Sequence, residues 1–137
     1  MMAFWVLLAC LLAMAAYVRL GPDVVERWHQ PLALMPTASG IVDEPGGARG
    51  FLPMADAKAG LERLAALVEA TPRATRLAGS VDEGRITWVV RSAVWGFPDY
   101  VTAEAGPEGL AVWSRLRYGR SDLGVNRARL EAWFARL

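Results

Sequence analysis

The N-terminal residues form a continuous apolar run that reaches its first charged side chain at Arg19. As a helix with a rise of 1.5 Å per residue, this run spans about 27–30 Å, the thickness of one hydrocarbon core. Gly21 and Pro22 end the helix. A cleaved signal peptide with a site at residues 13–15 is the alternative, but no Lys or Arg precedes the apolar run. The pattern therefore predicts a transmembrane anchor over residues 1–20.

The next segment, residues 21–55, is dense in residues that interrupt regular structure. After Gly21, its prolines and glycines are Pro22, Pro31, Pro36, Pro45, Pro53, Gly40, Gly46, Gly47 and Gly50. This density opposes a long helix or a central strand, so the segment is interpreted as a connector. It is too apolar for a solvated linker, and it is expected to lie against the bilayer or the domain. The apolar residues concerned are Val24, Val25, Trp28, Leu32, Leu34 and Met35.

A helical period begins at residue 56 and continues to Thr71. Asp56 is a suitable N-cap, and Pro72 prevents continuation of the helix. The apolar positions of this stretch recur at helical spacing: Leu61, Leu64, Ala65, Leu67 and Val68. The period predicts a helix that faces a core.

Four short runs with strand character follow, separated by turns rich in Gly, Pro and Asp. They cover residues 73–78, 85–92, 100–105 and 110–117. Short turns favour antiparallel neighbours. A second helical period closes the chain over residues 124–137, with apolar residues at Leu130, Trp133, Phe134 and Leu137. The expected class is α+β: an N-terminal transmembrane helix, then a domain over residues 56–137 with a four-stranded antiparallel sheet covered by two helices, in the order α-β-β-β-β-α.

Composition excludes several kinds of site. The formal net charge is +1, which gives no reason to expect nucleic acid as a partner. The chain has one cysteine and one histidine, so we expect no disulfide within it, no metal site and no cofactor.

The stretch from Trp113 to Arg129 contains five arginines between two apolar runs. A structural network is the preferred interpretation: a capping residue for the last helix, an asparagine that ties the turn, and an Arg–Asp pair that joins strand to helix. The residues assigned to this polar junction are Arg91, Asp99, Arg115, Ser121, Asp122, Asn126 and Arg127. The alternative is a site for an anion or a partner. The residues assigned to a partner surface are Trp28, Arg117, Arg120 and Arg129.

Two blocks of residues resemble a family. Residues 121–127 read Ser-Asp-Leu-Gly-Val-Asn-Arg, and residues 96–101 read Gly-Phe-Pro-Asp-Tyr-Val. Together with Pro72-Arg73 and Arg91-Ser92, they resemble a bacterial and plastid family of domains of unknown function, number fourteen ninety-nine. The resemblance covers roughly residues 56–137. It implies a membrane-anchored or exported domain and no established reaction.

Three functions are compatible with these patterns. The first is a non-catalytic accessory or assembly subunit that binds other membrane-protein subunits of a larger inner-membrane complex, respiratory or otherwise energy-transducing. The second is a stand-alone anchored domain that binds a lipid or small apolar ligand. The third is a hydrolase, which needs Ser114 or Ser121 near His29, or a carboxylate pair such as Asp99 and Asp122. No catalytic residue is assigned.

Two features of the sequence give opposite indications for the side of the membrane on which the domain lies. Arg19 and Arg27 follow the anchor, which favours a cytoplasmic domain by the positive-inside rule. A short N-terminus before one apolar helix is typical of a signal-anchor, and the family resemblance favours export. We therefore expect a single-pass protein of the bacterial inner membrane, in contact with membrane lipid, with its C-terminal domain in the periplasm.

Overall fold

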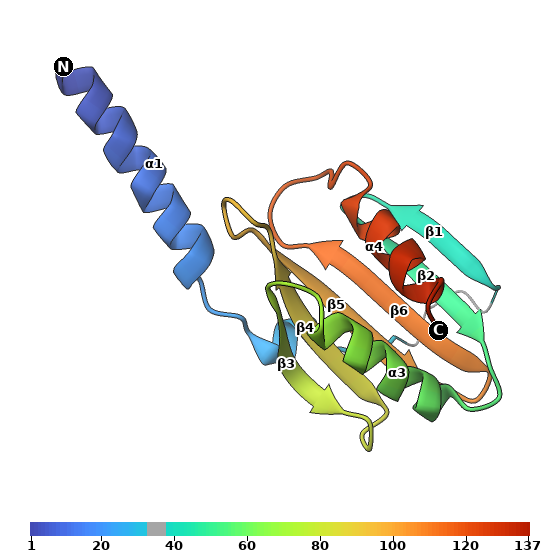
Figure 1. Cartoon of the computed structure of the whole chain (residues 1–137). Coiled ribbons are helices and arrows are strands. Elements are labelled where there is room, and N and C mark those ends of the chain that lie inside the picture. Colours follow the sequence, from blue (N-terminus) through green and yellow to red (C-terminus); the bar gives the residue numbers. More distant parts are fainter. Residues whose placement is uncertain (33–37) are drawn as a thin grey trace.

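A computed structural model describes residues 1–32 and 38–137 of the chain. One apolar helix projects from a twisted antiparallel sheet that carries two helices on one face (Figure 1). In chain order the elements are α1 (Met2–Leu20), α2 (Val25–Trp28), β1 (Gly40–Glu44), β2 (Gly47–Pro53), α3 (Ala57–Glu69), β3 (Ala74–Ser80), β4 (Arg85–Arg91), β5 (Pro98–Ala105), β6 (Gly109–Leu116) and α4 (Val125–Phe134).

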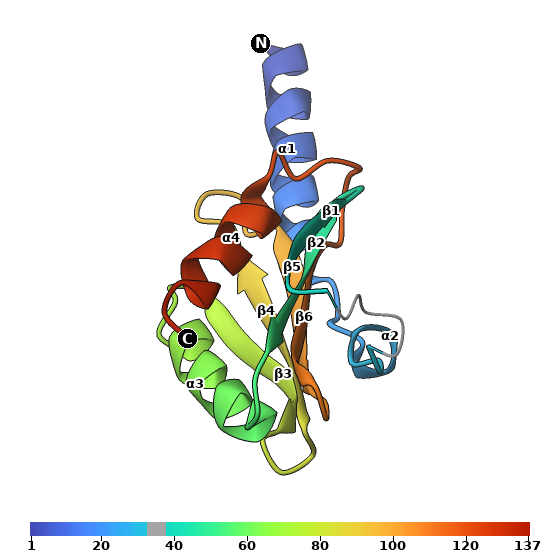
Figure 2. The same cartoon turned by 90° about the vertical axis from the view of Figure 1, so that its right-hand side faces the viewer.

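The sheet has the strand order β1-β2-β6-β5-β4-β3, and every neighbouring pair is antiparallel. The last four strands form a meander. Helix α3 connects β2 to β3 at the opposite edge, so it crosses one face of the sheet. Helix α4 lies on the same face over β2 and β6 (Figure 2). The α+β class, the antiparallel sheet and the N-terminal apolar helix agree with the prediction.

The predicted number of strands is wrong, because the sheet has six strands and not four. The additional pair, β1 and β2, lies within residues 21–55, which the sequence indicated as a connector. Pro45 and Gly46 form a two-residue turn between Glu44 and Gly47. Proline sets φ at the first turn position, and Gly46 has the positive φ of +72° that the second position requires. The Pro-Gly pair therefore marks a hairpin turn.

Two glycines are required inside β2 because neighbouring atoms leave no room for a side chain. A Cβ on Gly47 would lie 2.5 Å from the carbonyl oxygen of Ser114 on β6. A Cβ on Gly50 would lie 2.6 Å from the ring of Phe134 on α4. Helix α4 thus packs directly on the backbone of β2, which accounts for glycine in a strand that lies inside the sheet.

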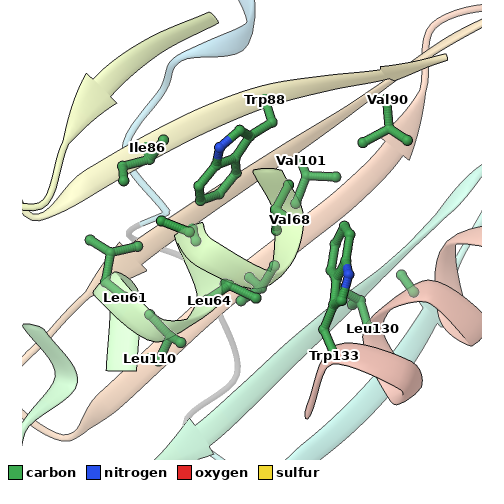
Figure 3. Packing of buried hydrophobic residues seen from close by; sticks show 14 residues of the cluster. Leu61, Leu64, Val68, Ile86, Trp88, Val90, Val101, Leu110, Leu130 and Trp133 are labelled. Atoms are coloured by element: carbon green, nitrogen blue, oxygen red, sulfur yellow. The ribbon is translucent and has the colours of Figure 1, made fainter. Parts of the chain in front are cut away.

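The main core lies between the sheet and the two helices (Figure 3). Asp56 begins α3 as predicted, since its carboxylate accepts a hydrogen bond from the backbone N–H of Ala59 at 2.9 Å. The buried side chains that meet in this core are Leu61, Leu64 and Val68 from α3, Leu130 and Trp133 from α4, and Ile86, Trp88, Val90, Val101, Leu110 and Val112 from the strands. Each fully buried large apolar side chain contributes about 1.5–3 kcal/mol to folding.

A smaller cluster lies on the other face of the sheet. Trp28 from α2 packs there with Val89 and Tyr100, and Figure 2 shows α2 on the side opposite α3 and α4. The segment after α1 therefore covers part of the second face. Leu34 and Met35, expected to lie against the bilayer or the domain, fall outside the described residues.

Helix α1 is long and apolar enough to cross a membrane by its length and composition. Val18 is its buried residue, and most of its other side chains are exposed. The Arg19 guanidinium donates hydrogen bonds to the carbonyl oxygens of Val94 at 2.7 Å and Trp95 at 3.4 Å. The last turn of α1 thus contacts the β4–β5 loop.

Candidate functional site

A pocket of about 560 Å³ lies at the end of the sheet where α1 joins it. The ends of α3, β4 and β6 and the starts of β5 and α4 surround it. We call it the α1-end pocket. Its lining combines the apolar side chains Pro72, Val90, Phe97, Leu116 and Val125 with the polar side chains Thr71, Arg73, Arg91, Ser92, Asp99, Tyr118, Ser121, Asp122 and Arg129.

One wall of the α1-end pocket is a buried polar network that joins β5, β6 and α4. The Arg129 guanidinium donates to Asp99 Oδ2 at 3.1 Å, to Asn126 Oδ1 at 2.6 Å and to Ser114 Oγ at 3.3 Å. Ser114 also donates to Asn126 Oδ1. Burial raises the pKa of Asp99 above its ordinary value, and the positive charge of Arg129 opposes that rise. The attraction between Arg129 and Asp99 therefore offsets the cost of removing the two charges from water.

Asp122 fixes the start of α4 beside this wall. Its carboxylate accepts hydrogen bonds from the backbone N–H of Gly124 at 3.1 Å and of Asn126 at 2.9 Å. Partial burial acts to raise the pKa of Asp122. The hydrogen bonds to Asn126 and Gly124 outweigh that effect, and the pKa lies below its ordinary value.

Two residues near the pocket have backbone conformations that side chains rarely adopt. Arg73, in the pocket lining, has φ of +62°, and Leu123, in the β6–α4 loop, has φ of +54°. Such positions carry strain of about 1–3 kcal/mol and gather at ligand sites. Leu123 is 93% exposed. The β4–β5 loop also exposes the apolar side chains Val94, Trp95 and Phe97, and the start of α4 exposes Val125.

A second polar cluster lies behind the pocket and joins α1 to the sheet. Asp23 accepts hydrogen bonds from the Tyr100 hydroxyl and from Arg91 at 3.0 Å, and it lies 3.6 Å from the Arg117 guanidinium. Arg117 also donates to the carbonyl oxygen of Pro22 at 2.9 Å. Burial and the Asp23 carboxylate raise the pKa of Tyr100 to about 12. These bonds hold the segment after α1 against three strands.

Most of the chain after α1 matches a known protein family. The family described as "Protein of unknown function (DUF1499)" matches residues 43–137. The chain belongs to this family. The membership predicted from the sequence is thereby confirmed, and every residue that lines the α1-end pocket lies within the matched range. No curated protein and no solved structure matches the chain.

The predicted polar-junction residues of the DUF1499 domain do not form one cluster. Asp99, Asp122 and Asn126 come together on the helical face, and Ser121 lines the pocket. Arg91 reaches Asp23 in the second cluster. Arg115 and Arg127 lie elsewhere: Arg115 is on the face opposite the helices, and Arg127 pairs near the surface with Asp43 and Glu131 at 2.9 Å each. Alternation along β6 separates Ser114 and Arg115 onto opposite faces.

The partner-surface residues also divide. Arg129 is placed differently from the expectation, because its side chain is 15% exposed and is the central donor of the buried network. Arg117 binds Pro22 and Tyr100, and Trp28 lies in the second core. Arg120 remains exposed in the β6–α4 loop.

Sequence reasoning did not identify Asp23 or Tyr100 as site residues. Tyr100 lies at the start of an expected strand and within the family block at residues 96–101. An acidic residue two positions after a helix break is an ordinary surface feature. Only the tertiary contacts with Arg91 and Arg117 show that Asp23 accepts charge-assisted hydrogen bonds.

Proposed function

We propose that this DUF1499 protein is a non-catalytic, single-pass membrane protein that binds one amphiphilic molecule, a lipid of the surrounding bilayer, in the α1-end pocket. The observation that carries the proposal is the position of that pocket at the end of the sheet joined by α1. Its volume of about 560 Å³ falls within the range for small-ligand sites. If α1 crosses the membrane, the pocket lies next to the bilayer surface.

The lining suits a molecule with an apolar and a polar end. Val90, Leu116 and Phe97 provide apolar contact, while Arg73, Ser92 and Ser121 provide hydrogen-bond donors. The Arg73 guanidinium donates to the carbonyl oxygen of Arg91 at 3.1 Å, which directs the side chain along the pocket margin. A guanidinium with no carboxylate partner among the described residues is well suited to a lipid phosphate or carboxylate.

Lipid analysis of the full chain tests the proposal. We expect protein extracted in mild detergent to retain a specific lipid that mass spectrometry detects at about one molecule per chain. Val125→Trp places an indole at the pocket margin and should remove that lipid. Val42→Trp is the matched control, because Val42 on β1 is 53% exposed and Val125 is 51% exposed. Equal lipid content in both variants would contradict the proposal.

A non-catalytic role is supported by the placement of the groups that hydrolysis would need. His29 lies on the second face of the sheet, where its Nδ1 is 2.9 Å from Thr87 Oγ1. Ser114 lies on the helical face and is bonded to Asn126, and Ser121 lines the α1-end pocket. The carboxylate of Asp99 is paired with Arg129, and the carboxylate of Asp122 accepts hydrogen bonds from backbone N–H groups. Hydrolysis assays on generic ester substrates should therefore give background rates.

The periplasmic side of a bacterial inner membrane is proposed for the domain, on the signal-anchor character of the N-terminus and the family resemblance. Protease added to spheroplasts should digest the domain while a cytoplasmic marker survives. Digestion only after lysis would place the domain on the cytoplasmic side.

An accessory or assembly subunit of a larger inner-membrane complex is the second candidate function. It is favoured by the outer edge of β1, which has a sheet neighbour only on its β2 side among the described strands. Such an edge accepts a strand from another protein. Native electrophoresis after mild solubilisation distinguishes the two, since a subunit migrates with a large complex and a stand-alone domain migrates alone.

A further inference from the structure

The second face of the sheet holds a buried positive charge without a carboxylate partner. Arg115 is 7% exposed and has no ion pair among the described residues, and residues 33–37 contain no acidic side chain. Its guanidinium donates to neutral oxygens: Trp28 O at 2.7 Å, Thr102 Oγ1 at 3.2 Å and Trp113 O at 3.3 Å. A buried charge normally has an ionic partner, because removal from water is costly.

Aromatic rings enclose this guanidinium. It lies 3.9 Å from the ring centroid of Trp113 and 5.4 Å from that of Trp28. These contacts stabilise a cation without neutralising it. Burial lowers the pKa of Arg115 to about 10, so the side chain still carries its positive charge at neutral pH.

Arg115 lines a pocket of about 370 Å³ that two further arginines also line. We call it the arginine–tryptophan pocket; its charged and aromatic residues are Arg27, Trp28, Glu44, Trp113, Arg115 and Arg117. Glu44 is the acidic side chain in this lining. It is already engaged by an ion pair with Arg49 and by the indole N–H of Trp113 at 2.9 Å.

The positive charge of Arg117 is only partly compensated, because the acidic group near it, Asp23, also pairs with Arg91. Arg27 lies over the outer face of Trp28, 5.0 Å from the ring centroid, and is exposed. The pocket therefore has three guanidinium groups on its lining and one carboxylate that other donors already satisfy.

We propose that the arginine–tryptophan pocket binds a phosphate-type anion, with Arg115 as the buried ligand and Arg27 as the exposed one. Guanidinium groups bind phosphate through paired, charge-assisted hydrogen bonds. The anion is either a free phosphate compound or the phosphate of an anionic lipid headgroup, and both present the same oxygens. This site is on the opposite face from the α1-end pocket and does not depend on the function proposed for that pocket.

The two sources are distinguished by thermal unfolding of the full chain in lipid nanodiscs. In phosphatidylcholine nanodiscs, inorganic phosphate should raise the unfolding temperature in a saturable manner if the ligand is a free anion. In phosphatidylglycerol nanodiscs, the temperature should already be raised without phosphate if the ligand is a headgroup. Either result supports the anion site, and the absence of both would overturn it.

Variants assign the effect to this pocket. Arg27→Ala should raise the half-saturating phosphate concentration, or weaken the lipid effect, by about tenfold, as expected for one lost charge-assisted contact. Arg63→Ala removes an exposed arginine from α3 on the other face and should leave the effect unchanged. Arg115→Lys keeps the positive charge but removes the paired N–H donors of the guanidinium. If this variant folds, it should no longer bind phosphate. An unchanged phosphate response in Arg27→Ala would overturn the proposal even if Arg115→Lys fails to fold.

Discussion

The indole of Trp28 lies flat on the phenol ring of Tyr100, with ring centroids 3.8 Å apart and an angle of 5° between the planes. This pair joins a short helix from the N-terminal segment to the middle of the sheet. The Tyr100 hydroxyl continues the connection by donating to Asp23. The pair is therefore the apolar part of the attachment between the segment after α1 and the DUF1499 domain.

Removal of the Trp28 ring should release that segment. Trp28→Ala should lower the free energy of unfolding by about 3–5 kcal/mol, because the ring is 8% exposed and its partners cannot close the space. Trp28→Phe retains a ring for stacking and should cost clearly less. Chemical denaturation of the full chain in detergent measures both, and limited proteolysis should cut Trp28→Ala within residues 21–32. Equal stability of the two variants would show that the stack is not needed.

Arg129→Met should destabilise the domain by about 3–5 kcal/mol at pH 7, because Asp99 is left as a buried charge without its partner. Arg136→Met, which removes an exposed arginine just after the end of the same helix, is the control. The pKa of Asp99 is already raised by burial and should rise further in the variant. A raised carboxylate pKa favours the protonated folded state, so stability lost at pH 7 is regained as pH falls toward 5. If the stability of the variant depends on pH in the same way as that of the parent, Arg129 is not the partner that keeps Asp99 charged.

Asp122→Ala should lower stability by about 1–2 kcal/mol, because the N–H groups of Gly124 and Asn126 lose their acceptor. The folded-state pKa of Asp122 is depressed, so its contribution is complete above the unfolded pKa of about 3.9 and is lost as pH falls through the folded value. The difference between parent and variant should therefore narrow below about pH 4. Asp82→Ala, at an exposed turn, should change stability by less than about 0.5 kcal/mol.

The exposed tip of the β6–α4 loop should contact the bilayer. In a Cys10→Ser background, a fluorophore at Leu123→Cys should be quenched by lipids with a spin label at the headgroup. Glu108→Cys is the control, because the β5–β6 turn lies at the other end of the sheet (Figure 1). Equal quenching at the two positions would mean that the loop does not face the membrane.

Periodicity predicted those parts of the fold that depend on a buried stripe. The α3 helix was predicted from its Leu and Val spacing, and Asp56 is its cap. The same reasoning failed for β1 and β2. In β2, close packing excludes the side chains that would produce an alternating pattern. Gly47 and Gly50 are glycine because Ser114 and Phe134 lie against the backbone. That information is in the partner elements, far along the chain, and not in the strand itself.

The site was less predictable than the fold. Composition suggested an Arg–Asp pair between strand and helix, but it could not say which arginine takes part. Arg129 lies one α4 turn after Asn126, and its guanidinium reaches Ser114 on β6 and Asp99 on the neighbouring strand β5. Arg115 is one position from Ser114 and faces the other side of the sheet. Pairings of this kind follow from the register of β5 against β6, which no local pattern encodes.

The ion pair between Asp23 and Arg91 limits how far the domain can move from α1. Gly21 and Pro22 are the two residues between α1 and Asp23. A connection of two residues is too short to let the domain extend away from its helix. The domain can rotate with the helix and diffuse laterally, but it cannot extend toward a target in the aqueous compartment. If α1 is embedded in a bilayer, any molecule that the domain binds must arrive at the membrane surface, either through the lipid plane or by adsorbing to it.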